Sequence, residues 1–427
     1  MSKLSGIILL INAMVANLIL YVSLFVSVFF EVFLLITYFE IREEIKFERA
    51  HAGKDNTDFP SVSIIVPSFN EGETVRATID SLLALDYPQH LLNLILVDDG
   101  SSDNTLEILN SYKGNPQVQI FSKKNGGKHT ALNLALEHVT TDLVGCLDAD
   151  SFVDREALKR IVPYFGDAAV MAVTPAVRIH EPKSILQHVQ KIEYSWGVLL
   201  RRILASIDGL YVTPGPFSIF RVNVFKELGG YRFAYHTEDM ELALRMQRHR
   251  YKIVNSSTAH VYTVGPAKLK GLYKQRVRWS YGFLNNMIDY KDMYFNPKFG
   301  SVGIFVLPIA TFSIFSTLFA ASQFVLSFLR RIPNAITKYQ AVGFSTPHLP
   351  HPSFDWFFIN TGFVSLLTVA AIGMSLVLLA LSLQMTEGKV RVTRGLLYYL
   401  ALYVFIVPFW LAKAVYATIR RQSISWR

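Results

Sequence analysis

The chain contains very little cysteine. Cys146 is the only one among 427 residues, so no disulfide can form within the chain. This excludes a secreted scaffold held together by several disulfides, and it fits a catalytic domain in a reducing compartment. Cys146 lies in an apolar run, LVGCL. We therefore interpret it as a packed core residue and not as a nucleophile.

Charge is also scarce. Charged residues make up 18% of the chain and hydrophobic residues 51%, and the mean hydropathy is +0.29. Soluble domains contain about 25% charged residues, so the composition indicates that part of the chain lies in lipid. The formal net charge is +9. The basic residues are spread out beside apolar runs, which favours contact with anionic lipid headgroups, and no nucleic-acid partner is expected.

Long apolar runs are present at both ends of the chain. Residues 7–38 are almost uninterrupted apolar sequence, far longer than the apolar region of about 7–15 residues in a signal peptide. We therefore predict an N-terminal transmembrane anchor within residues 1–40, although Glu31 lies inside it. Residues 286–427 are predicted to form a C-terminal membrane region with about three spans, from apolar blocks at 301–329, 356–383 and 394–418.

The stretch between these regions, residues 58–285, has a different pattern. Short apolar runs rich in β-branched residues alternate with helical patterns. Such runs suit strands buried on both faces, and the alternation predicts right-handed βαβ units of a parallel, Rossmann-like α/β sheet. The predicted strands are 62–69, 94–99, 118–121, 143–150 and 170–177. Ligands of such sheets bind outside the carboxyl ends of the strands.

Polar residues follow three of these strands. They form NEGET (70–74), VDDGSSDNT (97–105) and LDAD (147–150). Short carboxylates and amides on tight turns supply the donors and acceptors that a nucleotide needs. Asp148 and Asp150 suit Mg²⁺ or Mn²⁺, which takes one or two carboxylates plus phosphate oxygens. Each motif alone is a weak signal, because acidic turns are common.

The segment NGGKHTALN (125–133) combines glycine with a basic residue. Gly126 and Gly127 permit a close backbone approach, and Lys128 can reach a phosphate. The alternative is a flexible helix start with a solvated lysine.

An acidic pair, Glu238 and Asp239, begins the helical pattern HTEDMELALR (236–245). Carboxylates at this place can simply cap a helix. The functional alternative is a general base that takes the proton of an attacking hydroxyl group.

The segment QRVRW (275–279) follows several lysines. Arg278 can bind a diphosphate with two hydrogen bonds, and Trp279 offers a flat surface on which a sugar ring can stack. The alternative is an aromatic and basic belt beside a membrane helix.

Together the six motifs resemble those of inverting family-2 glycosyltransferases of the polysaccharide-synthase type, which include cellulose, chitin, hyaluronan and poly-N-acetylglucosamine synthases. VPSFNE, VDDGS, GGK, DAD, TED and QRVRW occur here in that family's order. The resemblance implies a GT-A fold, a UDP-sugar donor and membrane helices. It also implies roles for single residues: Glu71 and Asp99 at the uridine, Lys128, Asp148 and Arg278 at the diphosphate, Asp148 and Asp150 at the metal, Asp239 with Glu238 as the base, and Gln275 and Trp279 at the acceptor.

The TED and QRVRW forms are most similar to those of poly-N-acetylglucosamine synthases. This similarity favours transfer of N-acetylglucosamine to a growing β-linked polysaccharide. Two alternatives stay open. One is the transfer of a single sugar to a polyprenyl phosphate or another lipid acceptor, and the other is an inactive membrane scaffold.

Nucleotide sugars are cytosolic, so the resemblance implies a multi-pass protein of the plasma membrane with a cytosolic catalytic domain. An accessory membrane subunit is one open alternative for its partners. Four full spans would place the tail, with Arg420, Arg421 and Arg427, outside, together with the connector that carries Arg330 and Arg331. Both conflict with the excess of positive charge on the cytosolic side. We therefore expect one trailing block to be re-entrant or interfacial. The amphipathic stretch 185–203 either lies on the membrane or packs on the sheet.

Overall fold

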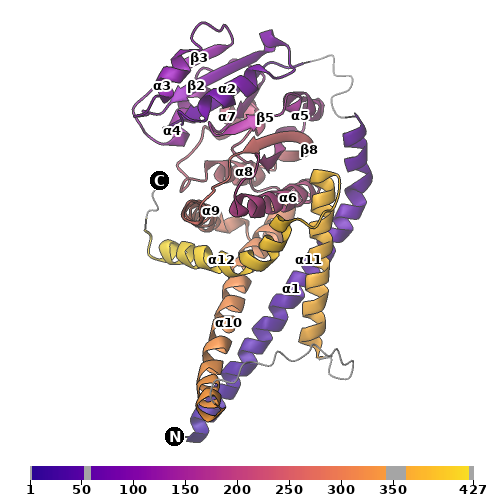
Figure 1. The fold of residues 1–427 in the computed structure, drawn as a ribbon. Helices are drawn as coiled ribbons and strands as arrows, with labels where there is room; N and C mark the ends of the chain where they lie inside the picture. The colour runs from indigo at the N-terminus through magenta and orange to yellow at the C-terminus, as the bar shows by residue number, and fades with distance from the viewer. Residues whose placement is uncertain (1, 52–58, 343–361, 423–427) are drawn as a thin grey trace. The chain divides into compact units, whose positions relative to one another are not determined.

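The computed structural model describes residues 2–51, 59–342 and 362–422 (Figure 1). Its contacts divide the chain into two compact units. The α/β unit comprises residues 37–309 and 381–427, and the helical unit comprises residues 1–36 and 310–380. The start of the predicted 58–285 domain, the first residues of the 356–383 block and Arg427 lie outside the described residues.

One eight-stranded sheet forms the centre of the α/β unit. Its strand order is β3-β2-β1-β4-β7-β6-β8-β5. The strands are β1 (Val62–Ser68), β2 (Leu92–Asp98), β3 (Val118–Ser122), β4 (Leu143–Cys146), β5 (Ser151–Val153), β6 (Val170–Ile179), β7 (Ile219–Arg221) and β8 (Lys252–Thr263).

Helices cover this sheet and form the helical unit. They are α1 (Ser2–His51), α2 (Val75–Leu83), α3 (Thr105–Asn110), α4 (Lys128–Leu136), α5 (Ala157–Ile161), α6 (Ile185–Ser206), α7 (Asn223–Leu228), α8 (Glu238–Arg248), α9 (Leu269–Asp289), α10 (Leu307–Val342), α11 (Phe363–Glu387) and α12 (Arg394–Ile419). Short 3₁₀ turns occur at Gln89–Leu91, Val162–Gly166, Lys291–Met293 and Pro297–Phe299, and a π turn at Val302–Val306.

The first half of the sheet is parallel, as predicted. β1 pairs in parallel with β2 on one side and with β4 on the other. In this register Ser68 lies opposite Asp98, and Ile65 lies opposite Cys146. The chain therefore leaves β1, β2 and β4 at the same edge of the sheet, which brings the polar motifs after these strands together.

The second half of the sheet is mixed, so the prediction of a parallel sheet is wrong there. β7 pairs antiparallel with β4 and β6, and β5 pairs antiparallel with β8, whereas β6 and β8 are parallel. β5 and β7 have three residues each, too few for a periodic signal. The predicted fourth strand also ends early, because β4 stops at Cys146 and leaves Asp148 and Asp150 on the following turn.

β8 escaped prediction because its middle is polar. Asn255, Ser256 and Thr258 are nevertheless buried. Burial of polar groups requires hydrogen-bond partners. The Asn255 side chain donates to Thr174 Oγ1 at 2.9 Å, and Glu48 of α1 accepts from the Ser257 backbone N–H at 3.0 Å. These partners come from distant parts of the sequence, so β8 depends on tertiary contacts.

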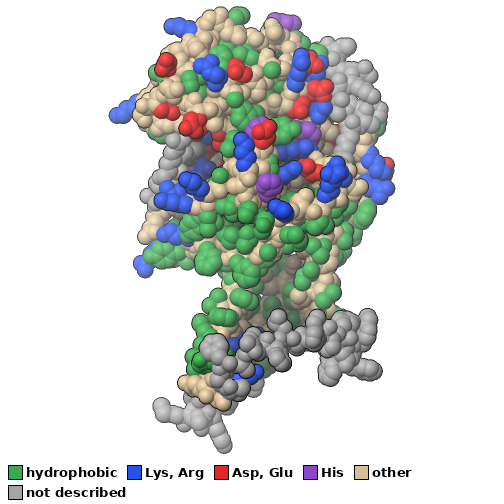
Figure 2. Space-filling view, in the orientation of Figure 1, with side chains coloured by type: hydrophobic (Ala, Val, Ile, Leu, Met, Phe, Trp, Pro, Cys, Tyr) green, Lys and Arg blue, Asp and Glu red, His purple; other side chains and the backbone are tan. Residues whose placement is uncertain are grey.

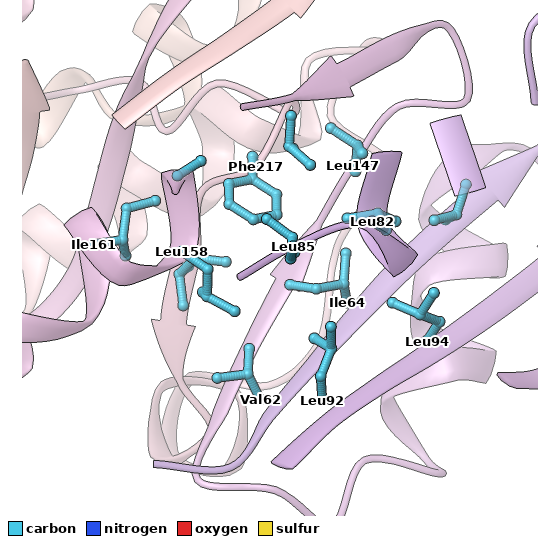
Figure 3. Packing of buried hydrophobic residues seen from close by; sticks show 14 of the residues in the cluster. Val62, Ile64, Leu82, Leu85, Leu92, Leu94, Leu147, Leu158, Ile161 and Phe217 are labelled. Carbon is cyan, nitrogen blue, oxygen red and sulfur yellow. The ribbon is translucent and has the colours of Figure 1, made fainter. Parts of the chain in front are cut away.

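Aliphatic side chains fill the space between the sheet and α2 and α5 (Figure 3). The cluster includes Val62 and Ile64 of β1, Leu92 and Leu94 of β2, Leu82 of α2, Leu158 and Ile161 of α5, and Phe217. Full burial of such a side chain stabilises the fold by about 1.5–3 kcal/mol. Cys146 is buried on the opposite face of the sheet, and burial raises the pKa of its thiol, so its interpretation as a core residue is confirmed.

α6 contacts the sheet and also α12. Ser184 begins the helix with a capping box, in which its hydroxyl accepts from the Gln187 N–H and the Gln187 side chain accepts from the Ser184 N–H. The helix packs on β6, β8 and α12. Of the two alternatives for residues 185–203, packing on the sheet is therefore confirmed.

α12 belongs to the α/β unit, although its sequence is apolar enough to span a membrane. It packs along α6 and α9 (Figure 1). Tyr403, Trp410, Ala414 and Ala417 are buried, while Phe409 is 70% exposed. The buried positions recur at helical spacing and define one packed face. Figure 2 shows hydrophobic side chains gathered over α12, with Lys and Arg side chains along their border.

Four helices in the described residues are long and apolar enough to cross a membrane: Met14–Glu48, Val302–Ala341, Phe363–Glu387 and Arg394–Ile419.

The helical unit contains most of the first three of these helices. Within the unit, Glu31 of α1 accepts a hydrogen bond from the Ser375 hydroxyl of α11. This contact satisfies one oxygen of a carboxyl group that is expensive to place in lipid. The predicted connector at Arg330 and Arg331 is wrong, because α10 continues as helix through both arginines and Pro333.

Candidate active site

Two loops at the sheet edge hold each other in place. The backbone N–H of Asn70 donates to Ser101 Oγ at 2.9 Å, and the Asn70 side-chain oxygen accepts from the Ser102 N–H at 2.8 Å. The Glu71 N–H donates to Thr105 Oγ1 at 2.8 Å. Asn70 has a φ of 54°, a left-handed conformation that asparagine tolerates better than most residues. The motifs after β1 and β2 therefore form one structure, with Glu71 beside the Thr74 hydroxyl at 3.2 Å.

Asp99 holds the glycine turn before α4. Its Oδ1 accepts from Lys123 Nζ at 2.7 Å and from the Gly126 N–H at 3.1 Å, and its Oδ2 accepts from the Gly127 N–H at 2.9 Å. The carboxyl group is buried, and φ of Gly127 is 91°. In the described residues Asp99 thus shapes the turn that presents Lys128. A role at the uridine stays a prediction.

Lys128 joins two of the acidic motifs. Its Nζ lies 2.5 Å from Asp148 Oδ1 and 3.5 Å from Glu238 Oε1. Burial alone would lower the pKa of Lys128, but Asp148 and Glu238 raise it well above its ordinary value. The ammonium is therefore charged and already paired. A Cβ at Gly215 would lie 2.9 Å from this Nζ and 3.1 Å from Asp148 Oδ2, so the 215–218 loop lies directly against the pair.

Asp150 lies in a concentration of negative charge. Its pKa is raised to about 7, first by burial and then by the carboxylates of Asp148 and Glu71. The Ser151 hydroxyl donates to it at 3.1 Å. No group of three or more His, Cys, Asp or Glu residues in the described part of the chain is arranged to hold a metal ion. Two neighbouring carboxylates without a further protein ligand fit Mg²⁺ or Mn²⁺, which completes its coordination with phosphate oxygens and water.

Asp239 and Glu238 stand at the start of α8. Asp239 is partly buried, and its pKa is raised to about 6, first by burial and then by the neighbouring Glu238 carboxylate. Tyr235 and His236, directly before this helix, both have positive φ, at 55° and 64°. Strained residues of this kind persist only where the surrounding structure fixes them. The acidic pair is therefore held in a defined place.

α9 carries QRVRW and contacts the start of α8. Gly282 of α9 approaches Thr237 so closely that a Cβ there would lie 2.3 Å from Thr237 Oγ1. The Asn286 side chain donates to the same oxygen at 3.0 Å. Thr237 directly precedes Glu238 and Asp239, so its packing and hydrogen bond with α9 hold the acidic pair next to this helix. Gln275, Arg278 and Trp279 are partly exposed on this helix.

A small pocket brings several of the predicted residues together. Lys128, Glu238 and Asp239 line it, with Cys146, Gly215 and Tyr231. Asp148 does not line this pocket, but it contacts Lys128, which does. Glu71, Asp99, Asp150, Gln275, Arg278 and Trp279 lie outside its lining.

Sequence reasoning missed several residues that shape the site. Lys123 pairs with Asp99, and the Thr213 hydroxyl donates to the Asp239 backbone carbonyl at 2.9 Å. Arg276, inside QRVRW, pairs with Glu193. Lys123 lies two residues before the NGGK segment, so a basic residue near the glycines was visible in the sequence. No motif near Thr213 or Glu193 indicated their contacts.

Comparison with known proteins identifies the family. Residues 63–229 match the family model described as glycosyl transferase family 2. The chain is 30% identical over 329 residues to a poly-beta-1,6-N-acetyl-D-glucosamine synthase of Staphylococcus epidermidis, covering 76% of this chain and 78% of that protein. The chain belongs to glycosyl transferase family 2. The family and enzyme class predicted from the motifs are confirmed.

Two further matches extend this result. A synthase of the same name from Staphylococcus aureus (strain COL) is 31% identical to this family-2 glycosyltransferase over 249 residues, or 57% of this chain and 60% of that protein. A solved mannosyltransferase from Pyrobaculum calidifontis, in complex with GDP-Man and Mn²⁺, has a TM-score of 0.59 at 18% identity, covering 95% of this chain and 99% of that one. The second likeness shows the fold, and the predicted GT-A domain with membrane helices is confirmed.

Proposed function

We propose that this family-2 glycosyltransferase extends a β-linked polysaccharide of N-acetylglucosamine with sugars from UDP-N-acetylglucosamine. The observation that carries the proposal is the attachment of the acidic pair to α9. Asp239 has the raised pKa of a general base, and Thr237 connects it to the helix that carries QRVRW. A base beside an acceptor surface suits a single displacement by a hydroxyl group. The similarity to two poly-beta-1,6-N-acetyl-D-glucosamine synthases supports the choice of sugar and product.

In this mechanism Asp239 is the general base. With a pKa of about 6 it is mostly ionised at neutral pH. It takes the proton of the acceptor hydroxyl as that oxygen bonds to the anomeric carbon. The bond from this carbon to the diphosphate breaks at the same time, and UDP leaves with the electron pair. One displacement inverts the anomeric centre, so an α-linked donor gives a β-linkage.

The other predicted residues bind the two substrates. Glu71 and Asp99 would bind the uridine, and Lys128 and Arg278 would bind the diphosphate. Gln275 and Trp279 hold the acceptor sugar. Asp148 and Asp150 would hold Mg²⁺ or Mn²⁺, which neutralises charge on the departing diphosphate.

The position of α12 supports a revised topology. If α1, α10 and α11 cross the membrane and α12 lies along α6 and α9, both ends of α12 are on the cytosolic side with the catalytic domain. Arg420 and Arg421 then obey the positive-inside rule. Arg330 and Arg331 remain near the outer end of α10. The plasma membrane is the expected site of the protein, and an accessory membrane subunit stays a prediction.

A donor panel tests the proposal. The purified full-length protein in lipid nanodiscs receives radiolabelled UDP-N-acetylglucosamine, UDP-glucose, UDP-glucuronate or GDP-mannose with Mg²⁺ or Mn²⁺, and the products are sized. Polymer from UDP-N-acetylglucosamine alone is the expected result. Exclusive formation of single-sugar lipids would replace it with the lipid-acceptor alternative, and the absence of both binding and hydrolysis of all donors would favour a scaffold.

A further inference from the structure

Arg276, the second residue of QRVRW, is more deeply buried than the residues around it that would face substrate. It is 4% exposed. Its Nη1 donates to the Gln275 side-chain oxygen at 2.9 Å, and its guanidinium lies over the Trp279 ring, 4.3 Å from the ring centre. Arg276 therefore contacts both residues that are proposed to hold the acceptor sugar. Such a cation–π contact contributes about 0.5–2 kcal/mol.

Glu193 of α6 fixes the other side of Arg276. Arg276 Nη2 donates to Glu193 Oε2 at 2.5 Å. The Arg276 side chain is 5% exposed and that of Glu193 is 27% exposed, so the pair is largely shielded from water. Removing the partner of a buried cation strongly destabilises the folded protein. Arg276 Nε has no hydrogen-bond partner in the described residues, whereas Nη1 and Nη2 contact Gln275 and Glu193.

The chain of contacts continues to α12. The Tyr403 hydroxyl donates to the same oxygen of Glu193 that Arg276 contacts. Tyr403 is 9% exposed. One carboxylate oxygen of α6 thus joins a tyrosine of α12 to an arginine of α9.

α12 is held on both sides of Tyr403. Near its start, a Cβ at Gly395 would lie 3.0 Å from the His188 backbone oxygen, which shows a close approach to α6. Near its end, Ala414 and Ala417 pack with Tyr281 of α9, and Thr418 Oγ1 accepts from the Asn285 side chain at 3.3 Å. Tyr403 lies between these contacts, so the helix backbone determines where its hydroxyl group lies.

We propose that Arg276 is a positioning residue for the acceptor site, and that α12 controls it through the Tyr403 hydroxyl and Glu193. Arg276 itself does not touch the reacting atoms. It orients the Gln275 amide and the Trp279 ring, and Glu193 and Tyr403 fix the orientation of its guanidinium. The inference rests on the proposed function insofar as α9 is taken as the acceptor surface. It assigns to α12 a role in acceptor binding that is separate from donor binding.

Tyr403→Phe tests this inference, with Tyr399→Phe as the matched control. Tyr399 lies one turn earlier on α12 and touches the Tyr403 ring, with centroids 5.0 Å apart, but its hydroxyl makes no hydrogen bond in the described residues. Both variants lose one hydroxyl from the same helix. Binding of a short N-acetylglucosamine oligosaccharide and of UDP is measured by calorimetry on full-length protein in nanodiscs, without any donor sugar.

For Tyr403→Phe we expect the dissociation constant of the oligosaccharide to rise roughly 5-fold, the size of one lost hydrogen bond. The dissociation constant of UDP should match that of Tyr399→Phe. In turnover assays the KM for the oligosaccharide should rise at unchanged KM for the donor, and the polymer should be shorter. In Glu193→Gln an amide oxygen can still accept the hydrogen bonds of Arg276 and Tyr403, but the negative charge is lost. Its dissociation constant for the oligosaccharide should lie between those of Tyr403→Phe and Arg276→Ala.

Equal oligosaccharide binding by Tyr403→Phe and Tyr399→Phe would overturn the inference, as would a parallel loss of UDP and oligosaccharide binding. These outcomes differ from failure of the proposed function. If the wild-type protein uses another donor, the same pair of variants is compared with an oligosaccharide of that sugar, and the inference stands or falls on that comparison.

Discussion

The proposed donor side and the proposed acceptor side of the site are built over very different distances in the sequence. On the donor side, Asn70 contacts Ser101 and Lys128 contacts Asp148, pairs that are 31 and 20 residues apart. On the acceptor side, Glu193 contacts Arg276 and Tyr403, which are 83 and 210 residues away. These two donor-side contacts lie within neighbouring βαβ units. The acceptor side exists only when α6, α9 and α12 pack together, so the two sides should respond differently to mutation.

Asp239→Asn should have the largest effect and separate chemistry from binding. The amide keeps the shape of the side chain but cannot take a proton, so transfer should fall about 10²–10⁴-fold. UDP binding should be unchanged, because the donor loops are not altered. Radiolabel incorporation and UDP calorimetry measure the two properties. Undiminished transfer would remove Asp239 from the role of base.

Asp150→Asn should weaken the donor side alone. Loss of one of the two carboxylates should raise the concentration of Mn²⁺ needed for half-maximal transfer by about 10–100-fold, the range seen when metal sites lose supporting groups. The oligosaccharide should still bind normally, because α9 is not altered. Metal titrations of activity, paired with oligosaccharide calorimetry, test this. An unchanged metal requirement would contradict a metal site at Asp148 and Asp150.

Lowering the pH should reduce transfer before it affects acceptor binding. The pKa of Asp239 is raised to about 6, so at saturating metal the rate should fall about 10-fold between pH 7 and pH 5 as the base becomes protonated. The pKa of Asp150 is raised to about 7, so the metal affinity should already decline as the pH falls through 7. Rates measured at several metal concentrations separate the two. A flat profile at saturating metal would exclude Asp239 as the titrating base.

The same two groups predict the sign of a change in stability. Their pKa values in the folded protein lie above the ordinary value of 3.8. Between about pH 4 and 7 the folded protein therefore holds protons that the unfolded chain has released. Their contribution to the free energy of unfolding should decrease as the pH rises through this range. Thermal unfolding of the metal-free protein against pH measures it.

Gly282→Ala should have the smallest effect of this series, confined to the contact between α8 and α9. The added Cβ would lie 2.3 Å from Thr237 Oγ1, so we expect a loss of about 1–3 kcal/mol in the free energy of unfolding. Gly271→Ala on the same helix is the control, because its nearest contact is 3.4 Å and the position is exposed. Alanine there should stabilise the helix by up to about 1 kcal/mol. Equal midpoints of unfolding for the two variants would contradict the close packing.

The sequence predicts the parts of the fold that local pattern determines. The apolar runs of β1, β2 and β4 and the helices between them were recognisable because each signal lies within one βαβ unit. β8 was not, because its buried Asn255 and Ser257 obtain their hydrogen bonds from Thr174 and Glu48. The prediction of a parallel sheet failed in the second half of the sheet because β7 has only three residues, which give no periodic signal. Its antiparallel pairing with β4 is a tertiary contact.

The site follows the same division. The motifs predict functional roles for Lys128 and Glu238, but they do not predict that Lys128 contacts both Asp148 and Glu238. The phosphate role of Lys128 and the uridine role of Asp99 were inferred from residue type. The folded chain already gives both side chains internal partners. Glu193 and Tyr403 could not have been selected, because neither belongs to a motif and their contact with Arg276 spans three helices.

α12 follows α6 and α9 in the sequence, and this order has a consequence for biosynthesis. A ribosome delivers the strands that carry the proposed donor site long before it delivers Tyr403. A nascent chain with its GT-A sheet folded would still lack the hydroxyl group that completes the contacts around Arg276. If Tyr403 acts as proposed, acceptor binding becomes possible only after α1, α10 and α11 have been made.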